Sequence, residues 1–151
     1  MVHARFSHTN LIARDWKGLA RFYETVFGCR PVPPERHISG QWIEDVTGVS
    51  GAEIHGVHLR LPGHGENGPT LEILQYKEPK EWLEPAINRP GLAHIAFEVD
   101  DVAAARDAVL ASGGGVVGKL VSHTVAGAGK LTIVYVTDPE GNIIELLKWS
   151  A

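Results

Sequence analysis

The sequence predicts an α+β protein built from two tandem modules, each with the order βαβββ. Three observations lead to this prediction. A segment that begins at His8 recurs 86 residues later, at His94. Each copy then continues into an aspartate and an apolar helical pattern, and each ends on a strand-like segment that carries a carboxylate, at Glu72 and at Glu145. An internal repeat of this kind indicates a duplicated structural unit.

The first half of each module is expected to be a strand followed by a capped helix. Asp15 and Asp101 each follow the module's histidine by seven residues, where a carboxylate can cap the first turn of a helix. Apolar residues between 16 and 27 recur at a helical spacing, and Gly28 predicts a left-handed stop. Glycines at 113–115 end the second copy of this pattern, so we expect the two helices to have the same length.

The second half of each module is expected to be strands, the last of which carries the carboxylate. In the second module, residues 131–137 and 142–149 flank Asp138-Pro-Glu-Gly141, a combination that predicts a hairpin. The first module offers comparable strand patterns at 57–62 and 70–76, with a glycine-rich loop between them.

The first module is the longer of the two. Its histidine and carboxylate are 64 residues apart, against 51 in the second module. We place the 13 extra residues within 31–56, as a short helix and loop that form a lid or a substrate wall. Trp42 in this insertion is the candidate substrate-binding residue. Glu44 and Glu53 are alternatives for a second acid or base.

Length and composition predict one ordinary domain. We assign residues 1–151 to it, with module 1 at about 4–76, a proline-containing linker at about 77–91 and module 2 at about 92–149. A net charge of −4 without a basic block argues against a nucleic-acid partner. The chain has no apolar run long enough to span a membrane and no secretory pattern, so we expect no membrane partner and a cytoplasmic location.

Two histidines and two carboxylates at matched positions of a repeat predict a metal site. Alternation along a strand sets His94 on the face opposite Ile95 and Phe97, and sets Glu145 among apolar neighbours, where a carboxylate needs a partner. His8, Glu72, His94 and Glu145 are therefore the expected ligands of one divalent metal per chain. Zn²⁺, Ni²⁺, Co²⁺, Mn²⁺ and Fe²⁺ all accept these ligand types.

The same segments resemble a known family. The first-strand histidine, Leu-Glu-Ile-Leu, His-Ile-Ala-Phe-Glu-Val-Asp-Asp and Asp-Pro-Glu-Gly-Asn-Ile-Ile-Glu-Leu are similar to the vicinal oxygen chelate (VOC) superfamily. This superfamily includes glyoxalase I, methylmalonyl-CoA epimerase, extradiol dioxygenases and fosfomycin resistance enzymes. The resemblance implies the glyoxalase/bleomycin resistance/dihydroxybiphenyl dioxygenase fold, in which two modules form a U-shaped open sheet around a metal cleft. It also implies a homodimer.

The resemblance further implies a reaction. The metal would chelate a small-molecule substrate through adjacent oxygens, and Glu145 or Glu72 would act as the catalytic base. The first expectation is an epimerase or isomerase, similar to methylmalonyl-CoA epimerase, that transfers a proton next to the chelated carbonyl. The alternatives are a lactoylglutathione lyase of the glyoxalase I type, an extradiol-type dioxygenase, and a non-enzymatic drug-sequestering protein similar to bleomycin resistance proteins.

Overall fold

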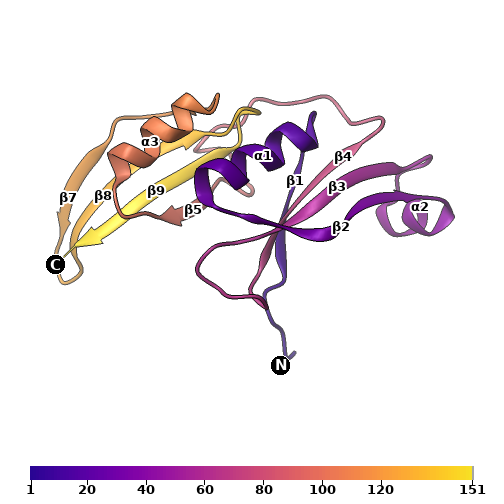
Figure 1. The fold of residues 1–151 in the computed structure, drawn as a ribbon, viewed down its shortest axis with the longest axis horizontal. Helices are drawn as coiled ribbons and strands as arrows, with labels where there is room; N and C mark the ends of the chain where they lie inside the picture. Colours follow the sequence, from indigo (N-terminus) through magenta and orange to yellow (C-terminus); the bar gives the residue numbers. More distant parts are fainter. Residues whose placement is uncertain (151) are drawn as a thin grey trace. The chain divides into compact units, whose positions relative to one another are not determined.

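The computed structural model describes residues 1–150, and the chain divides into two compact units, Met1–Glu81 and Trp82–Ala151 (Figure 1). Each unit contains one mixed β-sheet, with two helices in the first unit and one in the second, so the predicted α+β class is confirmed. No helix or strand lies between Tyr76 and Ile95 in the described chain. Within residues 1–150, none of the helices has the length and apolarity needed to cross a membrane.

The first unit contains a four-stranded sheet in the order β1-β4-β3-β2. Strands β1 and β4 run parallel, whereas the other neighbours are antiparallel. The elements in chain order are β1 (His8–Ile12), α1 (Trp16–Phe27), β2 (Arg30–Ser39), α2 (Gln41–Thr47), β3 (Glu53–Arg60) and β4 (Thr70–Tyr76). The short helix expected in the insertion is α2.

The second unit repeats this plan with a divided second strand. Its sheet has the order β5-β9-β8-β6, and β7 also pairs with β8. Strands β5 and β9 are parallel, as β1 and β4 are in the first unit. The elements are β5 (Ile95–Glu98), α3 (Val102–Ala111), β6 (Gly115–Val116), β7 (Val121–Val125), β8 (Gly129–Thr137) and β9 (Ile143–Ser150). The short strands β6 and β7 take the place of the long β2.

The caps predicted for α1 are present at both ends. The Asp15 carboxylate accepts a hydrogen bond from the N–H of Gly18 at 3.0 Å, which satisfies a donor that has no partner inside the helix. Gly28 takes the left-handed conformation at φ 66°. The buried side chains of α1 are Leu19, Ala20, Phe22 and Tyr23, all from the predicted apolar face.

The expected equality of the two helices is wrong. Asp101 caps α3 through the N–H of Ala104 at 3.0 Å, as predicted, but α3 has 10 residues and α1 has 12. Gly113, one position before the residue that aligns with Gly28, adopts a φ of 89°. The N–H of Gly114 then donates to the carbonyl of Val109 at 3.0 Å, so the chain leaves the helix early.

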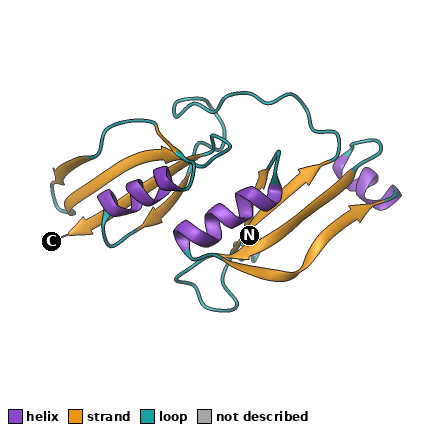
Figure 2. Cartoon of the chain, turned by 45° about the horizontal axis from the view of Figure 1, so that its top comes forward, coloured by secondary structure: helices purple, strands orange, loops and turns teal. Residues whose placement is uncertain are grey.

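Alternation along β3 separates two faces of the first sheet. Helix α1 covers one face of this sheet (Figure 2). Val57 and Leu59 are buried on that face. His58 lies between them and points to the other face, together with its register partner Glu72 on β4. Helix α2 also packs on that second face, where Ile43 joins a buried cluster with Ala52, Ile54 and Leu74. The polar face that carries Glu72 therefore has α2 at one end.

Candidate metal centre

His8 and Glu72 meet on neighbouring parallel strands of the first unit. His8 begins β1, and Asn10 is the register partner of Glu72 on β4. The Nε2 atom of His8 lies 3.6 Å from Oε2 of Glu72. The side-chain amide of Asn10 donates to that oxygen at 3.1 Å and to the Glu72 backbone carbonyl at 3.3 Å. Asn10 therefore orients the carboxylate, while the His8 side chain remains 40% exposed.

A second histidine, His58, contacts the other oxygen of Glu72. Its Nε2 lies 3.0 Å from Oε1 of Glu72, and its Nδ1 lies 2.9 Å from the Thr70 hydroxyl. A carboxylate only accepts hydrogen bonds, so Nε2 carries the hydrogen and the Thr70 hydroxyl donates to Nδ1. Burial lowers the pKa of His58, against the opposing attraction of Glu72, which favours a neutral ring at pH 7.

Sequence analysis did not assign His58 to the site. A signal was present, because buried Val57 and Leu59 on either side of it place its side chain on the opposite face. The missing information was the pairing of β3 with β4, which sets His58 directly across from Glu72.

The second unit contains an equivalent pair. His94 directly precedes β5, and its Nε2 lies 3.0 Å from Oε2 of Glu145 on β9. The Tyr135 hydroxyl donates to the same oxygen at 3.0 Å, and the rings of His94 and Tyr135 meet edge to face at 5.3 Å. Burial, and then the Glu145 carboxylate, raise the pKa of Tyr135, so its hydroxyl stays protonated and donates at neutral pH.

The chemistry of both pairs fits a divalent cation. The side chains of Glu72 and Glu145 are only 18% and 15% exposed, and within residues 1–150 their ionic partners are imidazoles rather than Lys or Arg. A carboxylate that is largely removed from water needs a compensating positive charge. Imidazole nitrogen and carboxylate oxygen are ligands that Zn²⁺ and similar metals accept. Among the described residues, Nδ1 of His94 is buried without a hydrogen-bond partner.

The structure therefore brings His8 to Glu72 and His94 to Glu145, each pair inside one unit. The candidate substrate residue, Trp42, lies on α2 with 60% of its surface exposed. Glu53, weighed as a second acid, lies on the face opposite Glu72, because it alternates along β3 with Ile54, which is on the Glu72 face. Its carboxylate forms an ion pair with Lys77 at 2.8 Å.

A hollow beside His58 is lined by three arginines. Its volume is about 280 Å³, and Arg5, Arg36 and Arg60 line it together with His58 and Thr70. Arg36 and His58 come from neighbouring strands and share the face that carries Glu72. Arg36 donates to the backbone carbonyl of Pro34 and Arg60 to that of Gly68, and the positive charge of the three arginines favours an anionic ligand in the hollow. Sequence analysis missed this cluster, because its members are widely separated along the chain.

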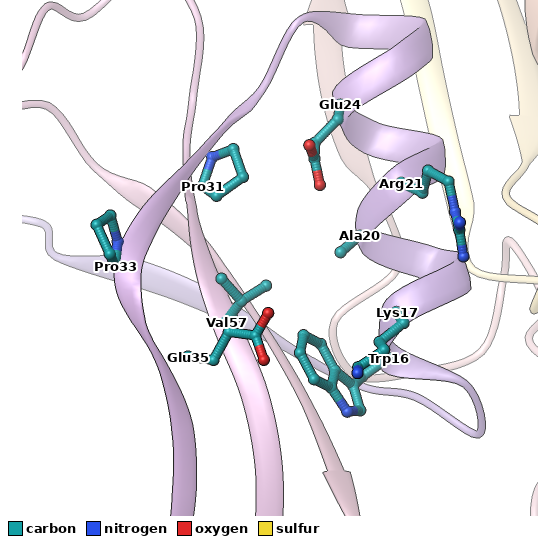
Figure 3. Close-up of a pocket in the computed structure, with 9 residues that line it drawn as sticks. All are labelled: Trp16, Lys17, Ala20, Arg21, Glu24, Pro31, Pro33, Glu35 and Val57. Carbon is teal, nitrogen blue, oxygen red and sulfur yellow. The ribbon is translucent and has the colours of Figure 1, made fainter.

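A larger hollow, of about 480 Å³, lies between α1 and β2 on the opposite face (Figure 3). Figure 3 shows Ala20 and Glu24 of α1 facing Pro31 of β2 across it, whereas Arg21 points away. Val57 lines this hollow, and His58, the next residue, points to the other side of the sheet. The hollow is therefore separated by the sheet from the His8–Glu72 pair.

A family model matches most of the chain, and solved structures share its fold. A family model described as Glyoxalase/Bleomycin resistance protein/Dioxygenase superfamily matches residues 5–146. A solved glyoxalase family protein from Bacillus cereus has a TM-score of 0.76 at 16% identity, covering 100% of this chain and 96% of that chain. The genomically encoded fosfomycin resistance protein FosX from Listeria monocytogenes has a TM-score of 0.63 at 16% identity, covering 99% and 96%.

A third solved structure is closer in sequence. It is an integron cassette protein from the mobile metagenome of V. cholerae, with a TM-score of 0.57 at 26% identity, covering 99% of this chain and 98% of that chain. None of the curated proteins has a significantly similar sequence.

Proposed function

This chain belongs to the Glyoxalase/Bleomycin resistance protein/Dioxygenase superfamily, and from that premise we propose that it is a divalent-metal-dependent enzyme that transfers a proton next to a carbonyl. The family includes metal-dependent enzymes and resistance proteins. The observation that carries the proposal is the pair of partly buried His–Glu contacts, His8 with Glu72 and His94 with Glu145, at equivalent places in the two units.

The proposed ligands are these four side chains. A bound divalent metal would polarise the carbonyl of a substrate with adjacent oxygens and make the neighbouring C–H more acidic. Asn10 and His58 orient Glu72 through its two oxygens, and Tyr135 orients Glu145 through one. Such neighbours hold a metal-binding carboxylate in a productive direction.

We assign the base to Glu145 rather than to Glu72. Both contacts of the Glu145 carboxylate, from His94 and Tyr135, go to Oε2. Its Oε1 has no hydrogen-bond partner among residues 1–150, so this oxygen is available to take a proton from carbon. In Glu72 both oxygens already accept hydrogen bonds, Oε1 from His58 and Oε2 from Asn10. Hydrogen bonds to a charged carboxylate oxygen lower its proton affinity, so an oxygen without such a bond is the better proton acceptor.

The arginine-lined hollow supports an anionic substrate. The hollow is lined by Arg5, Arg36 and Arg60 together with His58, and His58 contacts Glu72. A carboxylate or phosphate on the substrate would be bound there, next to the proposed metal ligands. An acyl-CoA or a related acid fits this description, and we therefore place the enzyme nearest to an epimerase of the methylmalonyl-CoA type. We also propose that the active form is a homodimer, which light scattering would test.

Elemental analysis of the purified protein tests the metal assignment. We expect His8→Ala and His94→Ala each to bind one divalent metal per chain fewer than the wild type. Incubation with acyl-CoA and 2-oxoacyl substrates in D₂O should then show exchange at the carbon next to the carbonyl. Oxygen uptake with catechols would indicate a dioxygenase, and glutathione-dependent turnover would indicate a lyase. Tight ligand binding without metal would indicate a sequestering protein.

A further inference from the structure

Three potential metal ligands lie together on the face of the first sheet opposite Glu72. His37 on β2 and His55 on β3 are direct register partners, and Glu53 precedes His55 by two residues, so it shares the same face. Their ligand atoms all lie within 4.8 Å of one another. The Oε1 atom of Glu53 is 3.4 Å from Nε2 of His37 and 3.7 Å from Nε2 of His55.

These spacings are close to those of an occupied zinc site. Ligand atoms about 2.1 Å from zinc stand about 3.4 Å apart in a tetrahedron. Both histidine-to-Glu53 distances are near that value. The two imidazole rings stack with centroids 4.2 Å apart and planes at 18°. The two side chains are 63% and 43% exposed, so their rings can turn to direct both Nε2 atoms at one ion.

Lys77 binds one oxygen of the Glu53 carboxylate and leaves the other oxygen facing the histidines. Its ammonium group donates to Oε2 of Glu53 at 2.8 Å, which leaves Oε1 directed toward His37 and His55. Hydrogen bonds from Lys77 and then from His37 lower the pKa of Glu53, so the carboxylate is ionised at neutral pH. An outer group that fixes the free oxygen of a ligand carboxylate is common around metal sites.

We propose that His37, Glu53 and His55 form a second divalent-metal site, for Zn²⁺ or a similar transition metal, separate from the His8–Glu72 pair. Two imidazoles and one carboxylate supply three protein ligands and leave a position for water. The bound metal would join β2 to β3 next to α2, which follows β2, and would stabilise that hairpin more strongly as the free metal concentration rises above the dissociation constant.

Zinc binding by equilibrium dialysis tests the site in a background that lacks the family ligands. The His8→Ala/His94→Ala protein, stripped with chelator, should bind one zinc per chain. Adding His55→Ala or His37→Ala should lower its zinc affinity at least tenfold, whereas His123→Ala, which replaces an exposed histidine on β7, should leave it unchanged. Circular dichroism establishes that each variant is folded.

Histidine ring NMR gives a second measurement that needs no substitution at His37 or His55. Zinc should shift the ring signals of His37 and His55 in the His8→Ala/His94→Ala protein and leave that of His123 in place. Failure of that protein to bind zinc, or equal affinity after His55→Ala, would overturn the proposal. If instead the wild type binds a single zinc that is lost with His55→Ala and kept in His8→Ala/His94→Ala, this site stands and the proposed catalytic metal centre fails.

Discussion

His58→Ala should weaken both the fold and the proposed metal centre, because His58 links Glu72 to Thr70. The substitution removes the 3.0 Å contact with Glu72 and the ring acceptor of the buried Thr70 hydroxyl. A hydrogen bond to a charged group contributes about 1.5–3 kcal/mol, and a buried hydroxyl without a partner costs about 1 kcal/mol. The side chains of His58 and Glu72 are 19% and 18% exposed. We therefore use the lower end for the hydrogen bond and expect the free energy of unfolding to fall by about 2.5 kcal/mol.

The same substitution should reduce metal affinity by about 10- to 100-fold, the range for losing a group that orients a ligand. Urea unfolding of the chelated protein measures the first effect, and competition with a coloured zinc chelator measures the second. His58→Gln, which keeps a side-chain donor, should recover part of both losses. His64→Ala, in the exposed loop before β4, is the matched control. Wild-type stability and metal affinity in His58→Ala would refute the argument that His58 positions Glu72.

Further substitutions test other parts of the structure. Glu145→Gln should keep the fold and part of the metal affinity while lowering deuterium exchange into substrate at least a hundredfold; full exchange would move the base elsewhere. Trp42→Ala should raise KM severalfold and leave the melting temperature unchanged, because the side chain is 60% exposed. Gly56→Ala should lower the free energy of unfolding by about 3 kcal/mol in urea titrations, since the new methyl group would overlap the carbonyl oxygen of Ile73 on β4. Burial, and then Glu24, raise the pKa of Cys29 to about 11. Because the thiolate is the reactive form, Cys29 should react with a thiol reagent at pH 8 roughly a hundredfold more slowly in the folded protein than in the unfolded chain. Equal rates would show that the structure around Cys29 opens readily.

Local signals in the sequence predicted much of the fold. Asp15 and Asp101 cap their helices because a short carboxylate can reach a nearby backbone N–H, and this depends on only a few consecutive residues. The turn at Asp138 is similar, since its carboxylate accepts from the backbone N–H groups of Glu140 and Asn142 at 2.9 and 3.0 Å. Comparing the two copies then extended these short signals to whole modules.

The neighbours of the candidate ligands could not be predicted in this way. Tyr135 reaches Glu145 because β8 and β9 pair in a register that sets them side by side, and Asn10 reaches Glu72 through the β1–β4 register. Register depends on how whole strands pack, and a shift by one residue would turn every side chain to the other face. The unequal helix lengths were missed because the chain turns after α3 at Gly113, whose φ is 89°, one residue before the position that aligns with Gly28.

In each unit the first strand pairs with the last, and this makes each His–Glu pair a product of complete folding. The contact between His8 and Glu72 joins residues 64 positions apart in the chain and so closes a long loop. The entropy lost in closing that loop is offset only when the strands between the two residues have packed. A chain that stops before β4, or one in which β1 has separated from the sheet, therefore lacks the His8–Glu72 pair that would bind a cation. Any ion bound between these residues would tie the two ends of the unit together, and its release should accompany the opening of β1 from β4. Metal release could then serve as a spectroscopic signal for the separation of first and last strands.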